Sequence, residues 1–329
     1  MVALQTILTP ILDGAIVSSF AGAIYALLSS RDKTGGMIDP ISNIVLGCSV
    51  TGCLQVLGKL LLPRLFGKLS LNKADLTPVE LSRNRGKFEE MVMSLVLMSI
   101  SSAFMYSIFE STDWAWWKDQ NLMYTGPSEP PSTTVNYFYS VTVGTWITSG
   151  FCCRFIEEKN RDWLLMYTHH ALTIALICGS YVISMERVGC IILFLHQVSD
   201  IVLNICQLCH YLGWDADHFP LHIPVAEALF AVNILSWIYT RLYILPTVCT
   251  VSVFTVMHDN EYCGDYSQGR YFCDLLGSFL CALQVMHVWW LYEMLSVAYK
   301  ILSGVGADAA ARSYLDEKKE KDQPKEKSQ

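Results

Sequence analysis

Long apolar blocks separated by short polar segments dominate this sequence. A helix needs about 20 mostly apolar residues to cross the hydrocarbon core of a bilayer. A search with windows of that length finds eight candidate spans, which lie at residues 9–29, 41–63, 89–109, 134–153, 163–184, 187–211, 224–249 and 272–299. Asp13 interrupts the first of them. Because backbone groups in lipid must be satisfied internally, we predict an all-α polytopic transmembrane bundle of seven or eight spans.

The composition supports this class and argues against nucleic acid as a partner. Charged residues make up only 16% of the chain, whereas soluble domains carry about 25%. The net charge of -7 provides no cationic surface for a phosphate backbone. We therefore expect membrane lipid to be both the solvent and the source of substrate.

Most of the 12 cysteines lie inside the apolar blocks without metal-ligand spacing, and we expect them to act as small packing residues. Cys263 and Cys273 are different because they lie in or beside a polar loop. A disulfide between them would need an oxidising compartment. The sequence leaves that pairing open.

Basic residues predict the orientation of the spans. They cluster between the second and third spans and after the fourth, at Arg64, Lys68, Lys73, Arg83, Arg85, Lys87, Arg154, Lys159 and Arg161. By the positive-inside rule both clusters face the cytosol, and alternation of the spans then places both termini there. Residues 304–329 are polar and mixed in charge, which predicts a disordered cytosolic tail.

Spans five and six concentrate polar side chains at membrane depth. Inserting a charged or imidazole side chain into the bilayer costs about 2–3 kcal/mol, so such side chains persist where a function or a partner retains them. The polar side chains are His169, His170 and Thr173 in span five, and His196, Gln197, Ser199, Asp200, Asn204 and Gln207 in span six.

The spacing of these residues predicts a site. His196, Asp200 and Asn204 recur every four residues and so share one helix face. The turn between the spans is short enough to force an antiparallel hairpin. His169 and His170 lie about 16 residues before its centre and Asp200 about 14 after, which is nearly the same depth at 1.5 Å per residue. We therefore predict an imidazole–carboxylate dyad inside the bilayer.

Such a dyad suits acyl transfer. A neutral imidazole can deprotonate an amine or attack a thioester, and a carboxylate can fix its tautomer. We expect His169 or His170 to be the nucleophile or base, Asp200 to orient it, and His196 to assist proton movement. The alternative is that these side chains only bond one helix to another.

A metal site is a weaker alternative. Membrane di-iron oxidases carry several HxxHH clusters, and the sequence has none. The remaining histidines are scattered toward loops or span ends, at His210, His218, His222, His258 and His287. We expect no bound metal.

Residues 166–214 resemble the Lag1 motif of ceramide synthases within the TLC domain. The matching positions are His169, His170, Thr173, Ser180, Tyr181, Arg187, Gly189, His196, Ser199, Asp200, Leu203, Tyr211 and Gly213. Weaker likenesses at residues 86–89, 240–246 and 283–300 extend the resemblance over about residues 83–303.

The resemblance implies three parts: N-terminal spans with a cytosolic loop over 1–82, a TLC catalytic membrane domain enclosing a lipid cavity over 83–303, and the tail. It implies an endoplasmic-reticulum N-acyltransferase that joins a fatty acyl group from acyl-CoA to the amino group of a sphingoid base. No bound cofactor is expected beyond acyl-CoA as co-substrate, and a homo- or heterodimer is compatible with the family. The paired histidines are implied to carry the acyl-transfer chemistry.

We also expect particular side chains to bind the substrates. Those expected at the lipid substrate are Thr173, Ser180, Tyr181, Ser199 and Asn204, and those expected at acyl-CoA are Arg154, Lys159 and Arg161. The segment at about 251–270 corresponds to a lumenal loop that the family associates with acyl-chain length.

Three departures from the family pattern favour other functions. Gln197 stands where the family has Asp, and Asn204 and Gln207 stand where it has Glu and Lys. One alternative is therefore a non-catalytic TLC-domain protein that binds lipid or escorts cargo. Another is an acyltransferase for a different long-chain amine or alcohol.

Overall fold

The computed structural model describes residues 9–11, 13–14, 40–66, 78–112, 114–118, 133–156, 162–183, 185–212, 225–258 and 267–304. Every long element within those ranges is helical, which confirms the all-α prediction. The helices are α2 (Pro40–Phe66), α3 (Pro78–Ser111), α4 (Thr133–Phe155), α5 (Trp163–Val182), α6 (Glu186–Tyr211), α7 (Val225–Trp237), η4 (Ile238–Thr250), α8 (Val251–His258) and α10 (Ser267–Leu302).

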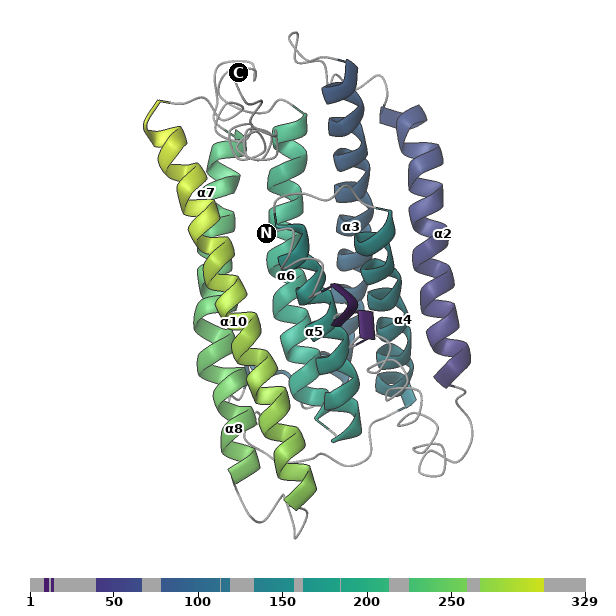
Figure 1. Ribbon diagram of the computed structural model, residues 1–329, viewed down its shortest axis with the longest axis vertical. Helices are drawn as coiled ribbons and strands as arrows, with labels where there is room; N and C mark the ends of the chain where they lie inside the picture. Colours follow the sequence, from purple (N-terminus) through teal and green to yellow (C-terminus); the bar gives the residue numbers. More distant parts are fainter. Residues whose placement is uncertain are drawn as a thin grey trace, which may run out of the picture.

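The helices lie side by side along the long axis of the molecule (Figure 1). α2 packs against α3 and α4 at one edge, α3 packs against α6, and α4 packs against α5. At the other edge α10 runs obliquely and contacts α5, α7, η4 and α8. α5 and α6 therefore lie in the interior, between the two edges.

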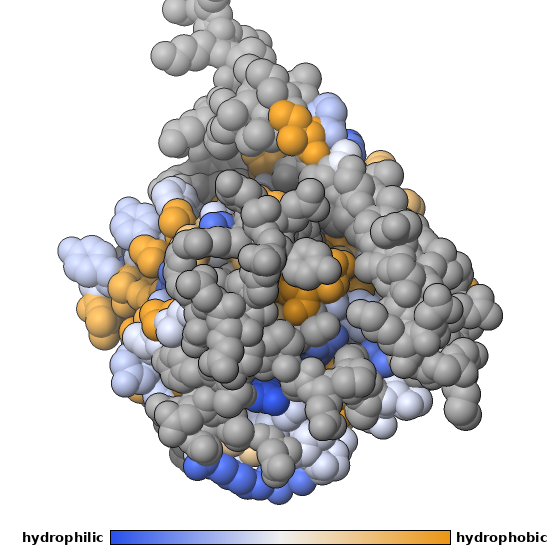
Figure 2. Space-filling view, turned by 90° about the horizontal axis from the view of Figure 1, so that it is seen from below, coloured by the Kyte–Doolittle hydropathy of each residue, from blue (hydrophilic) through white to orange (hydrophobic). Residues whose placement is uncertain are grey.

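Within the described part of the chain, four helices are long and apolar enough to cross a membrane: Asn84–Ser111, Glu186–Tyr211, Val225–Thr255 and Cys273–Leu302. A shorter apolar helix covers Ser42–Gly58. Large apolar side chains reach the rim of the molecule when it is viewed from below (Figure 2), and Val285 and Tyr292 of α10 are more than 60% exposed. The chain is thus a multi-pass membrane protein, whereas the count of seven or eight spans stays a prediction.

The helix predicted at 224–249 is a rod with an unusual centre. α7, η4 and α8 follow one another without a break, and η4 is a π-helix of 13 residues with Pro246 inside it. Proline cannot donate a backbone hydrogen bond and crowds the preceding turn, and wider π turns often occur at functional positions. Arg241 lies in this segment and is 2% exposed.

The cysteines divide between the interior and the outer surface of the bundle. Of the cysteines expected to pack, Cys53 and Cys281 are exposed instead, because an outward face toward lipid accepts a thiol as readily as the interior does. Cys263, Lys159, Arg161 and the tail beyond 304 lie outside the described residues. The Cys263–Cys273 pairing and the disordered tail stay predictions.

α2 and α4 approach closely at two glycines. A Cβ on Gly144 would lie 2.2 Å from the carbonyl oxygen of Ile44, and one on Gly47 would lie 2.2 Å from that of Val141. Small residues at such crossings let backbones pack in membranes. The colliding atoms belong to the backbone, so no side-chain rotation relieves the clash.

We expect Gly144→Ala to lower the thermal melting temperature of the detergent-solubilised protein, because the two backbones must separate. Gly52→Ala is the matched control on α2, since nothing lies within 4 Å of its Cβ position. Alanine favours a helix over glycine by up to about 1 kcal/mol, so this control should melt at or above the wild-type temperature. Equal melting of the two variants would show that the crossing is not tight.

Candidate functional site

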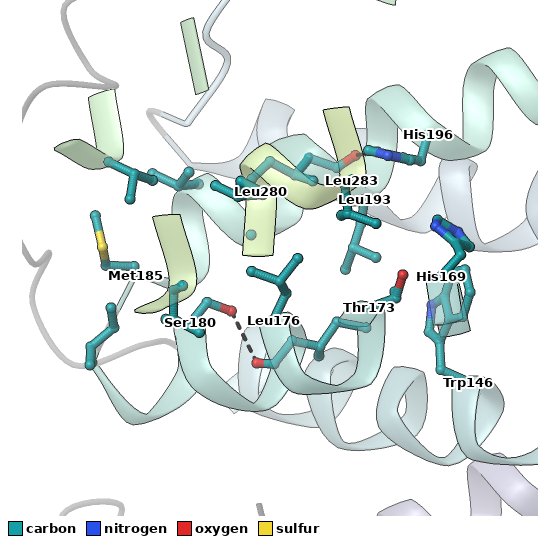
Figure 3. Close-up of a pocket in the computed structure, with 17 residues that line it drawn as sticks. Trp146, His169, Thr173, Leu176, Ser180, Met185, Leu193, His196, Leu280 and Leu283 are labelled. Atoms are coloured by element: carbon teal, nitrogen blue, oxygen red, sulfur yellow. Dashed lines mark hydrogen bonds between the residues drawn. The ribbon is translucent and has the colours of Figure 1, made fainter. Parts of the chain in front are cut away.

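An apolar cavity lies inside the bundle between α4, α5, α6, α8 and α10, and with its mouth it has about 660 Å³ of empty space. Its lining is Trp146, His169, Thr173, Leu176, Ile177, Ser180, Ile183, Met185, Val188, Gly189, Ile192, Leu193, His196, Val253, Leu276, Leu280 and Leu283. The two imidazoles and Thr173 lie together at one end, and Met185 lies at the opposite end (Figure 3). The cavity therefore has one polar end with two imidazoles and a remainder that is apolar apart from Ser180.

Helical periodicity explains this lining. α5 contributes Thr173, Leu176 and Ser180, which are three or four residues apart and so lie on one face. α10 contributes Leu276, Leu280 and Leu283 with the same spacing. The apolar side chains between the two ends can solvate a hydrocarbon chain.

The paired histidines of α5 point in different directions. Adjacent helical residues point about 100° apart, and of these two only His169 is among the residues that line the cavity. His169 lines the cavity, whereas Nε2 of His170 lies 3.4 Å from Oγ of Ser149 on α4. The ring of Trp146 packs edge-on against both, at centroid distances of 5.9 and 5.5 Å. The sequence left open which histidine meets the substrate, and this geometry favours His169.

A third and a fourth histidine complete the polar end. Nδ1 of His196 lies 2.7 Å from the carbonyl oxygen of Ile192, and its Nε2 lies 3.2 Å from Nε2 of His287. The rings of His196 and His169 are nearly parallel, 6.3 Å apart at their centroids. His287 is fully buried, so its predicted place near a loop or span end was wrong. It lies 91 residues beyond His196, and no local pattern in the sequence connects the two.

Asp200 does not form the predicted dyad with an imidazole of α5. Its carboxylate instead accepts a hydrogen bond from Nη2 of Arg241, in an ion pair whose guanidinium is buried and whose carboxylate is largely so. The same guanidinium donates to Oγ of Ser199 at 2.8 Å and to the carbonyl oxygen of His196 at 3.1 Å. A charge in the bilayer interior needs a counter-charge, and a guanidinium satisfies a carboxylate better than a neutral imidazole does. The helix that faces Asp200 is η4 and not α5, so the predicted pairing across the α5–α6 hairpin was wrong.

Comparison with known proteins places the chain in a family. The family model described as the TLC domain matches residues 87–296, which is more than half of the chain. The chain belongs to the TLC-domain family. The site described above lies almost wholly within the matched residues.

Relatives of this TLC-domain chain include three proteins named as ceramide synthases. The chain is 30% identical over 192 residues to human ceramide synthase 5, covering 58% of this chain and 45% of that one. It is 29% identical over 213 residues to ceramide synthase hyl-2 of Caenorhabditis elegans, covering 61% of each. It is 26% identical over 273 residues to ceramide synthase LOH1 of Arabidopsis thaliana, covering 78% of this chain and 83% of that one. The chain thus spans about half the length of the animal relatives that it matches.

The side chains that we expected at the lipid substrate divide into two groups. Thr173 and Ser180 line the cavity of the TLC domain. Tyr181 packs against Tyr139 at a centroid distance of 5.9 Å, and Ser199 contacts Arg241. Nδ2 of Asn204 lies 3.2 Å from Oγ of Ser94 on α3. Tyr181, Ser199 and Asn204 are not among the described residues that line the cavity.

Two departures from the family pattern lie at a helix interface. Gln197 donates to Oγ of Ser101 at 3.0 Å and accepts from Oγ of Ser102 at 3.2 Å, so it joins α6 to α3. Asn204 joins the same two helices through Ser94. For these two residues the helix-to-helix role that we considered from the sequence describes the geometry, and the substitutions leave the cavity lining unchanged.

Arg154, expected at acyl-CoA, already has an acidic neighbour. Its Nε lies 3.3 Å from the carboxylate of Asp13, which also accepts a hydrogen bond from the hydroxyl of Tyr167. The residue that interrupts the first predicted span is therefore held at the junction of α4 and α5.

Because Arg241 and Asp200 form an ion pair, we expect the effects of replacing them on the stability of the protein not to add. Arg241→Met leaves a buried carboxylate without its counter-charge, which costs about 3–5 kcal/mol, whereas removing both charges costs far less. We expect the melting temperature in detergent to fall for Arg241→Met and to recover largely in Arg241→Met/Asp200→Leu. Arg154→Met is the control, because its ion pair is partly exposed and should contribute less. A double variant no more stable than the single one would contradict the pairing.

Proposed function

We propose that this chain is an N-acyltransferase that moves a fatty acyl group from acyl-CoA to the amino group of a sphingoid base, giving a ceramide. The observation that carries the proposal is the apolar cavity that ends at the imidazole of His169 in a TLC domain. Relatives named ceramide synthase in animals and plants support it. The resemblance supports the endoplasmic-reticulum membrane as its location and the cytosol for the C-terminus.

In this proposal the acyl chain lies among the leucines and the thioester carbonyl lies beside His169. Among the described residues no hydrogen bond engages the His169 ring, and its Nδ1 is buried without a partner. The ring is therefore available to take a proton. The amine nitrogen attacks the carbonyl carbon and gives its proton to His169, the C–S bond breaks, and the departing thiolate receives that proton. The products are an amide and free CoA thiol.

Asp200 acts indirectly in this scheme. Its carboxylate holds Arg241, and Arg241 binds the carbonyl of His196 and the hydroxyl of Ser199. The pair thereby fixes the α6 backbone at the polar end of the cavity. No metal or bound cofactor takes part in the proposed reaction.

The enzymatic proposal is tested in cells that lack their own ceramide synthases and receive labelled sphinganine. Wild-type protein should yield labelled N-acyl product, and His169→Gln should lower the rate by about 10²–10⁴-fold, as expected when a general base is removed. His170→Gln is the matched control and should lose less, because its ring contacts Ser149 and not the cavity.

Two results would contradict this account. Wild-type protein that reaches its membrane and yields no product would refute the enzymatic assignment. A larger loss in His170→Gln than in His169→Gln would refute the assignment of His169.

A non-catalytic lipid-binding protein is the second candidate, favoured by the departures at Gln197 and Asn204. Both functions use the same cavity, so they differ only in turnover. A photoreactive fatty acid that labels the cavity lining of a wild-type protein without N-acyl product would favour this candidate.

The placement of the acyl chain makes a further prediction. Leu280 lines the cavity between Met185 and the histidines (Figure 3), and Leu275 on the same helix is 46% exposed toward the outside. Leu280→Trp should reduce kcat/KM for long-chain acyl-CoA more than for short-chain acyl-CoA, because an indole fills space that a long chain needs. Leu275→Trp should leave the preference unchanged. An unaltered preference in Leu280→Trp would place the chain elsewhere.

A further inference from the structure

The hydrogen-bond geometry of His196 fixes its tautomer. A carbonyl oxygen can only accept, so the 2.7 Å contact with Ile192 requires a proton on Nδ1 of His196. Nε2 of the neutral ring is then an acceptor. The 3.2 Å contact between the two Nε2 atoms therefore requires His287 to be the donor.

The surroundings of His287 agree with this assignment. A neutral His287 that carries its proton on Nε2 has none on Nδ1, and that Nδ1 is buried without a partner among the described residues. The opposite assignment would leave a buried N–H without an acceptor, which costs more than a buried acceptor without a donor. Trp237 and Trp290 enclose the ring at centroid distances of 5.8 and 6.2 Å. Nε1 of Trp237 also donates to the backbone carbonyl of His287 at 3.1 Å.

Both nitrogens of His196 are consequently engaged, although this ring lines the cavity. His169 lies beside it with a nearly parallel ring and makes no hydrogen bond with any described residue. Two imidazoles thus meet the cavity, and only one of them can exchange a proton with a substrate. The residue that creates this asymmetry is His287 on α10.

We propose that His287 is a positioning residue for the acyl-transfer reaction: by donating to Nε2 of His196 it fixes that ring and prevents it from competing with His169. This inference rests on the proposed function. It assigns a role to a histidine that contacts His196 and is absent from the cavity lining.

The kinetic test compares two substitutions at the same position. His287→Gln retains an N–H donor on a side chain of similar reach, whereas His287→Met fills the space and cannot donate. We expect His287→Met to lower kcat by about 10–100-fold, as small misplacements at a reacting centre do, with KM for acyl-CoA nearly unchanged. His287→Gln should restore most of kcat. Wild-type kcat in the Met variant, or an equal loss in both variants, would overturn the proposal.

A second readout does not depend on turnover. Diethyl pyrocarbonate acylates imidazole nitrogens that have a free lone pair, and mass spectrometry of the detergent-solubilised full chain reports which histidine reacts. We expect His196 to react faster in His287→Met than in the wild type, and His287→Gln to match the wild type. Equal reaction rates in all three proteins would overturn the proposal. An inactive wild type that still shows the expected pattern would refute the proposed function and leave the hydrogen bond intact.

Discussion

The polar face of α6 must find partners inside the bundle, and this requirement organises the rest of the structure. Lipid offers no hydrogen bonds, so each polar group on that face is satisfied by another helix or stays costly. His287 of α10 satisfies His196, and Arg241 of η4 satisfies Asp200 and Ser199. Serines of α3 satisfy Gln197 and Asn204 in the same way. A single helix thereby holds α3, η4 and α10 in register.

These contacts distinguish the polar side chains that bond one helix to another from the one imidazole that faces the cavity without a hydrogen bond among the described residues. The polar side chains of α6 described above form hydrogen bonds that hold the bundle together, and both ring nitrogens of His196 are engaged in this way. His169 on α5 faces the apolar cavity beside them without such a contact among the described residues. A free imidazole next to a row of aliphatic side chains suits the proposed acyl transfer from a long chain.

The sequence predicted the membrane class and the helices that the structure describes, because the length of the apolar blocks determines them directly. It did not predict which helix faces Asp200, because depth within one hairpin does not determine the direction of a side chain. Arg241 was the available signal, since a lone cation in an apolar segment needs an anion at its own depth. His287 offered a similar signal as a polar residue in the middle of α10. The distinction between His169 and His170 also needed the structure. The two side chains point about 100° apart on α5, and the sequence does not show which of them faces the cavity.

The proposed function requires an acyl chain in this cavity with its carbonyl at His169. An acyl-CoA that carries a photoreactive diazirine at the end of the chain can be cross-linked to the full-length protein in membranes, and the labelled residues can be mapped by mass spectrometry. We expect labels at the end of the cavity far from the histidines, on Met185 and its neighbours, and their loss when unlabelled long-chain acyl-CoA competes. Labels confined to the outer face of α10, on residues such as Val285 and Tyr292, would contradict this placement of the chain.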